Sequence, residues 1–414
     1  MHLSPARLRS RFRLRRRVGL LAGLGVAAGL AGSLAAEQVI LTEDLALHRG
    51  TILSADGRGI AFVPSGTLGA EEAIELLPSA SCVGFIDLGV GIQLAPDGGL
   101  LLLSDGQRLP GRPELRGGRL LWRHETLGSI DLDLEWVDAI VLSLSTPLPV
   151  ATEKDVIVLR NGDRLEGIVE SLGPEIVLAE EVGAEAGRLR IPFERVANIA
   201  FVAPPRAGSG SRIWFRDGTV LDAQRPTIAS GILHVAGIAL ALPGGSGEDP
   251  QRRRLDVASL AVPLPLVRGV RFVDAAITPV ARLEPLAIEA PPERFSAPPP
   301  TVLDFDAPLG LSRLRLAGPM SLRLALPAEA RRLVAELRLP DEALPWGSVE
   351  VTIRDVEGVR YNGVLDGNRR RVLVDVEVAG RYLDVELGEA ENGPIGDIVI
   401  VESGLVSSVK PPTP

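Results

Sequence analysis

Residues 156–167 read VIVLRNGDRLEG, and this stretch decides the fold class of the chain. An apolar run precedes Asn161-Gly162, and a polar-apolar alternation follows it. Asn-Gly between two such runs predicts a β-hairpin, because both central residues of the favoured two-residue turn need a positive φ. We therefore expect Asn161 and Gly162 to serve backbone geometry and not catalysis.

The same turn occurs three times. Asp105-Gly106, Asn161-Gly162 and Asp217-Gly218 stand 56 residues apart, and a fixed spacing of this length indicates repeated supersecondary units. Each unit continues with a second pair of strands and ends in an apolar closing strand. Five short strands in about 50 residues are typical of a small, strongly bent antiparallel barrel. The closing strands are predicted at WVDAIVLSL from Trp136, RVANIAFV from Arg195 and LDVASLAVPL from Leu255.

Proline-rich breaks divide the chain into segments. We expect a divergent first β-unit, closed by CVGFIDL from Cys82, and three further β-units that resemble Sm-like or SH3-like small barrels in strand spacing and turn. A stiff Pro-rich linker, a C-terminal sandwich and a short tail follow. The expected ranges are 37–95, 96–147, 152–203 and 210–290 for the units, 291–301 for the linker, 302–406 for the sandwich and 407–414 for the tail.

The charge of the chain excludes one class of partner. The 414 residues are 46% hydrophobic and 23% charged, which is ordinary for folded globular protein, and the formal net charge is −9. Residues 1–36 hold seven Arg and no acidic residue, so removing their charge from −9 leaves −16 on the remainder. Phosphate backbones are bound by excess Lys and Arg. We therefore expect no nucleic-acid partner, and the Sm-like outline does not imply RNA binding.

The N-terminus has the pattern of a secretory signal over residues 1–36. The basic stretch RLRSRFRLRRR from Arg7 precedes the apolar run VGLLAGLGVAAGLA from Val18, and small residues follow at Ser33 and Ala35. An uncleaved anchor is the alternative, because residues 18–36 nearly reach the length of a membrane span. Both interpretations predict export, to the periplasm, the cell envelope or the exterior, with this segment alone engaging the membrane.

Residues 302–406 alternate apolar and polar positions through seven or more segments, which predicts a jelly-roll-like antiparallel β-sandwich. The parts WGSVEVTIRDVEGVRYNGVL from Trp346 and RRVLVDVEVAGRYLDVELGEAENGPIGDIVIVESGLV from Arg370 carry a family resemblance. Gly347-Ser348-Val349 opens a long strand, and Gly396-Asp397 precedes the last one. In these features the domain resembles the NPCBM-type module, which is assigned to carbohydrate binding beside glycoside hydrolases and has a fold similar to galactose-binding sandwiches.

The resemblance implies a polysaccharide or glycoconjugate as ligand. Sugar sites combine an aromatic face with fixed polar groups that recognise hydroxyls. An alternative keeps the sandwich as a protein-binding module of a cell-envelope component, which the aromatic content of only 4% favours. The candidate ligand-binding residues are Trp346, Tyr361 and Asn362, with Asp366, Asn368 and Asp397 as hydrogen-bond acceptors.

No catalytic motif stands out. The sequence contains no Walker loop, Rossmann fingerprint, Gly-x-Ser-x-Gly elbow or His-Glu-x-x-His. His124 is the best general base on paper, but Glu125 beside it points to the opposite face of a strand. Asp131, Asp133 and Glu135 are expected on one strand face, where a solvated acidic surface is the favoured interpretation over a cation site or a glycosidase pair.

The single cysteine, Cys82, lies in apolar surroundings and predicts a buried structural thiol. The sequence therefore predicts an exported carbohydrate-binding or scaffold protein that is not an enzyme and needs no metal or cofactor. A glycan hydrolase with an unrecognised carboxylate pair is the remaining alternative.

Overall fold

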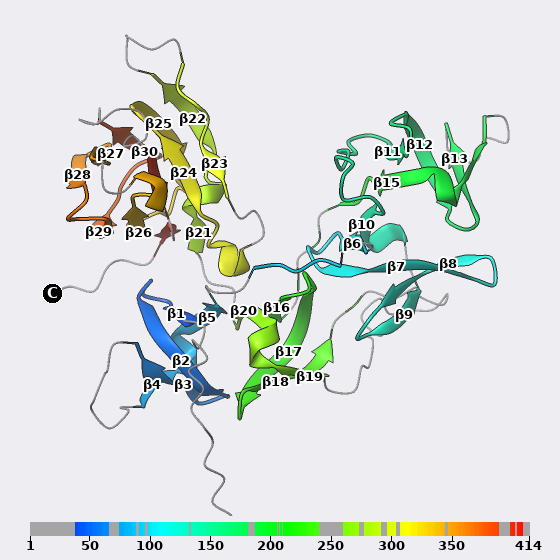
Figure 1. Cartoon of the computed structure of the whole chain (residues 1–414), viewed down its shortest axis with the longest axis horizontal. Helices are drawn as coiled ribbons and strands as arrows, with labels where there is room; N and C mark the ends of the chain where they lie inside the picture. Colours follow the sequence, from blue (N-terminus) through cyan, green and yellow to red (C-terminus); the bar gives the residue numbers. More distant parts are fainter. Residues whose placement is uncertain are drawn as a thin grey trace, which may run out of the picture. The chain divides into compact units, whose positions relative to one another are not determined.

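The regular structure is all β, as predicted (Figure 1). No described helix is long and apolar enough to cross a membrane, and the expected signal or anchor lies outside the described residues. The computed structural model describes residues 38–65, 74–87, 91–95, 98–131, 134–180, 187–204, 206, 208, 210–238, 240, 260–272, 277–290, 296–303, 307–343, 347–388, 398–401 and 404–408.

Four β-units share one strand order, with five antiparallel strands and a 3-10 turn before the fifth (Figure 1). Unit 1 comprises β1 Gln38–Thr42, β2 Leu47–Ala55, β3 Gly59–Pro64, β4 Glu75–Pro78, η1 Ser79–Ser81 and β5 Cys82–Asp87. Unit 2 comprises β6 Gly99–Leu103, β7 Arg108–Arg116, β8 Arg119–His124, β9 Gly128–Asp131, η2 Leu134–Trp136 and β10 Val137–Val141. Unit 3 comprises β11 Asp155–Leu159, β12 Arg164–Ser171, β13 Glu175–Ala179, β14 Leu189–Pro192, η3 Phe193–Arg195 and β15 Val196–Ala200. Unit 4 comprises β16 Ser211–Phe215, β17 Val220–Ala229, β18 Ile232–Ile238, β19 Leu260–Pro263, η4 Leu264–Leu266 and β20 Val267–Arg271.

In every unit the first strand pairs with both the second and the fifth. This pairing closes the sheet around apolar side chains, and one buried cluster runs through all four units. Cys82 belongs to that cluster, and burial raises the pKa of its thiol, which fits a structural role.

Three sequence assignments are wrong in detail. The closing strand of unit 4 is Val267–Arg271, and residues 260–263 of the predicted LDVASLAVPL form its fourth strand instead. Residues 277–289, assigned to this unit, pair with sandwich strands. Asp131 ends a strand and Glu135 lies in a 3-10 turn, so the two do not share a strand face, while Asp133 lies outside the described residues.

The repeated turn serves the backbone, but it is not the predicted two-residue turn. In unit 3 the Gly162 N–H donates to the Leu159 carbonyl and the Leu159 N–H donates to the Asp163 carbonyl, both at 2.9 Å. Only the glycine has a positive φ, at 91°. This is a type I turn followed by a left-handed residue, the usual three-residue hairpin. The Asn161 side-chain oxygen accepts from the Asp163 N–H at 3.2 Å.

Unit 1 keeps this turn without a glycine. The Leu45 N–H donates to the Thr42 carbonyl at 2.9 Å and the Thr42 N–H donates to the Ala46 carbonyl at 3.1 Å. Leu45 therefore occupies the glycine position, with a φ of 59°. A leucine there is strained, because its Cβ crowds the following carbonyl. Its side chain is 1% exposed and belongs to a cluster that includes Leu311, Val334 and Leu405 of the sandwich.

The closing strands also pair between units. β5 of unit 1 lies antiparallel to β20 of unit 4, with Val270 opposite Phe85, and β10 of unit 2 lies antiparallel to β15 of unit 3, with Ile140 opposite Ile199. Each closing strand thus has a neighbour on both sides, which explains why all residues of β5 and β15 are buried.

The C-terminal domain is a two-sheet β-sandwich with its own buried core. Residues 277–289 contribute two strands to it and the predicted linker contributes part of a third, so the domain begins earlier than residue 302. Ser407, assigned to the tail, ends its last strand. One sheet contains β21 Ile277–Pro279, β23 Thr301–Val302, β24 Leu314–Ala317, β26 Arg332–Arg338, β29 Arg371–Glu377, β31 Ile398–Val401 and β32 Leu405–Ser407. The other contains β22 Pro285–Glu289, β25 Met320–Ala325, β27 Val349–Asp355, β28 Gly358–Leu365 and β30 Tyr382–Leu387.

The sandwich contacts the junction of units 1 and 4. Its 3-10 turn η6, Pro308–Gly310, packs over two glycines of the paired closing strands. A Cβ on Gly269 would lie 2.6 Å from Pro308 Cβ, and one on Gly84 would lie 2.8 Å from Leu309 Cδ2. Arg332 of the sandwich also donates to the Asp44 carbonyl in the unit 1 turn. Glycine at both junction positions thus permits the close approach.

Candidate functional site

The predicted ligand-binding residues do not converge. Trp346 and Asp397 lie outside the described residues. Tyr361 and Asn362 are neighbours on β28, so their side chains point to opposite faces of the sheet. Tyr361 lies opposite buried Ile353, is partly buried and packs against the sandwich core, so its role as a sugar contact stays a prediction.

Asp366 and Asn368 lie in the turn after β28. The Asp366 carboxylate accepts the backbone N–H groups of Asn368 at 2.8 Å and Arg369 at 2.7 Å. A carboxylate that accepts two local N–H groups stabilises a turn. The Asp366 carboxylate therefore has a structural explanation, whereas Asn368 contributes only its backbone N–H and is exposed. Asn362 is also exposed, and its side chain hydrogen-bonds to Glu350 and Thr352.

The outer face of the five-stranded sheet brings Asn362 together with polar residues that the sequence did not single out. Strand pairing places one row of side chains across all five strands, and directly opposite residues point to the same face. That row runs Glu289, Ser321, Glu386, Thr352 and Asn362. A second row runs Ala287, Arg323, Asp384, Arg354 and Val359. We call the surface formed by these two rows the sheet face.

The Arg323–Asp384 pair is a bidentate ion pair of the sheet face. Arg323 donates from Nε and Nη2 to the two Asp384 carboxylate oxygens at 2.7 and 2.8 Å. This hydrogen-bonded carboxylate raises the pKa of the Arg323 guanidinium. The same guanidinium lies 4.3 Å from the ring centroid of Tyr382, which stands two residues before Asp384 on β30. The arrangement fixes an aromatic ring, a cation and a carboxylate side by side.

The first row is also connected by hydrogen bonds. Asn362 Nδ2 donates to Glu350 at 2.9 Å and to the Thr352 hydroxyl at 3.0 Å. Arg354 Nε donates to Glu386 at 3.3 Å, which links the two rows. Amide, hydroxyl and carboxylate groups in fixed positions are the groups that recognise hydroxyls of a ligand.

The sequence contained a partial indication of this surface. In MSLRLALP and RYLDVELG, charged residues alternate with leucine and valine, so Arg323, Asp384 and Glu386 had to face outward. Their pairing could not be read, because it depends on β25 lying beside β30 with Arg323 opposite Asp384.

A cavity of about 190 Å³ lies on the other sheet of the sandwich. Its polar lining comes from Thr278 of β21, Glu329 of a loop, Ser407 of β32 and the adjacent Ser408. Its size suits a few water molecules or one small polar molecule. The described residues around it include no aromatic ring.

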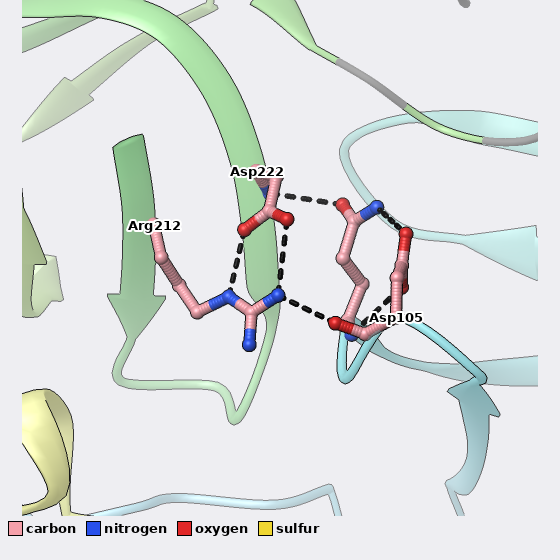
Figure 2. A network of polar contacts seen from close by, with 4 residues as sticks. Asp105, Arg212 and Asp222 are labelled. Carbon is pink, nitrogen blue, oxygen red and sulfur yellow. Dashed lines mark hydrogen bonds and ion pairs between the residues drawn. The ribbon is translucent and has the colours of Figure 1, made fainter. Parts of the chain in front are cut away.

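A polar network connects units 2 and 4 (Figure 2). Asp222, whose side chain is 1% exposed, accepts from Arg212 Nε at 2.7 Å and Nη2 at 3.0 Å. Arg212 also donates to the Asp105 carbonyl at 2.6 Å, and the Asp222 N–H donates to the Gln107 side chain at 2.9 Å. The partners are hydrogen-bonded to one another, and Asp222 and Gln107 are buried, so the network holds two units together and does not form a binding site.

His124 has a comparable structural role. Its Nδ1 accepts the N–H groups of Thr126 and Leu127, both at 3.1 Å, and its Nε2 lies 3.0 Å from the Thr219 hydroxyl of unit 4. Nδ1 is therefore unprotonated and Nε2 carries the hydrogen. Burial lowers the pKa of His124, against the opposing effect of Asp217 and Glu125. Among the described residues, no three His, Cys, Asp or Glu side chains are grouped as a metal site requires.

No protein-family model and no curated protein match the chain. Solved structures similar to parts of it include carbohydrate-binding modules and a family two carbohydrate esterase from Cellvibrio japonicus. CBM51 from Clostridium perfringens GH95, in complex with methyl-galactose, is 10% identical, with a TM-score of 0.25 and coverage of 32% of this chain and 99% of that chain. The tandem CBM51 modules of Sp3GH98, the family 98 glycoside hydrolase from Streptococcus pneumoniae, are 8% identical, with a TM-score of 0.26; the match covers 49% of this chain and 89% of that chain. The M60 catalytic domain with CBM51-1 and CBM51-2 from Clostridium perfringens ZmpB is 8% identical, with a TM-score of 0.25; the match covers 87% of this chain and 55% of that chain. Identities and TM-scores this low assign neither a fold nor a ligand to this chain.

Proposed function

We propose that this chain is an exported, non-catalytic carbohydrate-binding protein. In this proposal the sheet face of the sandwich binds the sugar and the four β-units are the scaffold that carries it. The supporting observation is the fixed group of Arg323, Asp384 and Tyr382 beside a row of hydroxyl, amide and carboxylate groups. The basic and apolar pattern of residues 1–36 supports export.

Carbohydrate suits the chemistry of this face. A sugar ring offers hydroxyls that both donate and accept, together with an apolar side that stacks on an aromatic ring. Asp384 and Glu386 provide acceptors, Arg323 and Asn362 provide donors, and Tyr382 provides a ring on the same surface. The side chains are held by one another before any ligand binds, which reduces the ordering cost of binding.

The pairing of the carboxylates favours binding over hydrolysis. A glycosidase needs two carboxyl groups that reach the glycosidic bond of the substrate from either side. Both Asp384 oxygens accept from Arg323 and Glu386 accepts from Arg354, so these carboxylates are already engaged by side chains of the same face. This arrangement supports a role as hydrogen-bond acceptors.

Retention of the purified chain on immobilised polysaccharides and cell-wall fractions tests the proposal. Tyr382→Ala and Asp384→Ala should lose retention, whereas Tyr361→Phe, on the core side of the same sheet, should keep it. Glu166→Ala is a control outside the sandwich, because Glu166 forms an arginine–carboxylate pair with Arg164 in unit 3 at 3.0 Å. Failure of every glycan to retain the folded chain would reject carbohydrate binding and favour a protein partner in the envelope.

A further inference from the structure

The sheet face is an elongated surface that crosses five strands and not a pocket, and we call its long direction the track. Its two rows each cross five strands, a span of about 19 Å at ~4.8 Å per interstrand step. The rows are two residues apart along each strand, or about 7 Å. Arg323 and Glu386 are 46% and 43% exposed at the side chain, whereas Asp384 is 16% exposed and Thr352 is buried between them. The longer side chains therefore form the accessible part of the face.

We infer that the ligand is an uncharged glycan bound along its length, with its chain axis across the strands of the sheet. This inference rests on the proposed function. Successive sugar rings would meet successive strands, because one interstrand step is comparable to the length of one pyranose unit. A terminal sugar alone would use only a small part of the rows.

The charge of the sheet face selects against anionic chains. Each arginine of the sheet face is already paired with a carboxylate. Among the described side chains of this face, carboxylates outnumber arginines. A uronic acid or a sulfated sugar would bring its own negative groups against Asp384 and Glu386, which lowers affinity by like-charge repulsion. Neutral hydroxyls can donate to the same carboxylates. The arginines are Arg323 and Arg354, and the carboxylates are Asp384, Glu386, Glu289 and the adjacent Glu350.

Tyr382 marks one side of the track. It lies opposite Ala325 and two residues before Asp384, so its ring faces outward beside the second row. The Arg323 guanidinium holds the ring from one side at 4.3 Å. A preordered ring is a stacking surface for one sugar of the chain, and the rows then direct the next sugars toward β27 and β28.

Two measurements on the full-length chain test the inference. The first is affinity gel electrophoresis in neutral polymers (mixed-linkage β-glucan, xylan and galactomannan) and in anionic polymers (polygalacturonate, alginate and hyaluronan). We expect retardation by at least one neutral polymer and by none of the anionic ones. The second is calorimetric titration with oligosaccharides of one to six units from the retained polymer. We expect affinity to rise with length and to level off at about five units, one for each of the five strands.

The outcomes separate the inference from the proposed function. A monosaccharide that binds as tightly as the tetrasaccharide, or preference for an anionic polymer, would overturn the inference and leave carbohydrate binding intact. Retardation that Tyr382→Ala leaves unchanged would place the sugar elsewhere and overturn the inference. Asn362→Ala should lower affinity for long oligosaccharides about tenfold and leave short ones unaffected, because Asn362 is at the far end of its row. No retardation by any polymer would reject both ideas.

Discussion

Leu45 offers a prediction in which two opposing effects can be separated. It occupies the left-handed position of the unit 1 turn, with a φ of 59°, where the other three units have glycine. Leucine costs about 1–2 kcal/mol there relative to glycine. The same side chain is 1% exposed in the cluster between unit 1 and the sandwich, so its burial offsets the strain.

The magnitudes follow from these two terms. Leu45→Ala removes the buried side chain and keeps the strain, so the free energy of unfolding should fall by about 3 kcal/mol. Leu45→Gly removes the same contacts and relieves the strain, while glycine adds about 0.5–1 kcal/mol of unfolded-state entropy. The glycine variant should therefore be more stable than the alanine variant by up to about 1 kcal/mol.

Equilibrium urea denaturation, followed by tryptophan fluorescence and by circular dichroism, measures this difference. Leu101 is the matched control, because it is also 1% exposed but lies within strand β6. At Leu101 the glycine variant should be the less stable one, by about 0.5–1 kcal/mol relative to alanine. The reasoning about strain fails if Leu45→Gly is less stable than Leu45→Ala by the same margin as at Leu101.

Three further stability predictions follow from the β-units. The Asp222 side chain is 1% exposed, and Asp222→Ala leaves Arg212 without its paired carboxylate. The free energy of unfolding should therefore fall by about 3–5 kcal/mol. A loss of less than about 1 kcal/mol in urea denaturation would contradict this prediction. The Cβ of Gly162→Ala would meet no atom within 4 Å, so this variant should lose only about 1–2 kcal/mol of unfolding free energy, the strain of a φ of 91°. The Cβ of Gly218→Ala would lie 2.6 Å from Leu94 Cδ2, so this variant should lose more stability in the same assay. Burial lowers the pKa of His124 below its ordinary value of 6.5, so the unfolded chain is protonated before the folded one as the pH falls. The contribution of neutral His124 to stability is therefore fully present above about pH 6.5 and is lost as the pH falls toward the lower pKa of the folded state. Relative to His124→Gln, wild type should therefore lose stability between about pH 7 and 5, and an unchanged difference across that range would refute the burial of neutral His124.

The repeat could be read from the sequence because it depends on local geometry. Asp-Gly and Asn-Gly recur at a fixed spacing, and the glycine φ values of 82°, 91° and 91° show the reason for that residue. The turn type was misread because a two-residue turn and a three-residue turn with a left-handed glycine share the same dipeptide. Only the strand register, with Val158 opposite Arg164, distinguishes the two.

The pairing of strands from different units could not be predicted from the sequence. Strand β5 of the first unit pairs with β20 of the fourth unit. Their apolar sequences, VGFI and VRGV, do not indicate which strand each one pairs with. The domain boundary was misplaced for a related reason. The Pro-rich stretch before residue 301 lies between two strands of the sandwich, and it was taken as the separation between domains. The polar groups of the sheet face could not be listed from the sequence, because their proximity depends on the strand register, such as Arg323 opposite Asp384.

The contact with the sandwich explains the divergence of the unit 1 turn and one glycine of the closing strands. Leu45 and Gly269 lie where the sandwich contacts the units, whereas a Cβ on Gly84 would first meet the Val270 carbonyl of the paired strand at 2.2 Å and then Leu309 of the sandwich at 2.8 Å. A solvent-exposed turn would favour glycine over Leu45, and a free strand would favour a larger residue over Gly269. The contact is therefore part of the folded structure of both domains. A fragment that begins at Ala307 would lack β21, β22 and β23 as well as this contact, so ligand binding by the sandwich has to be measured on the whole chain.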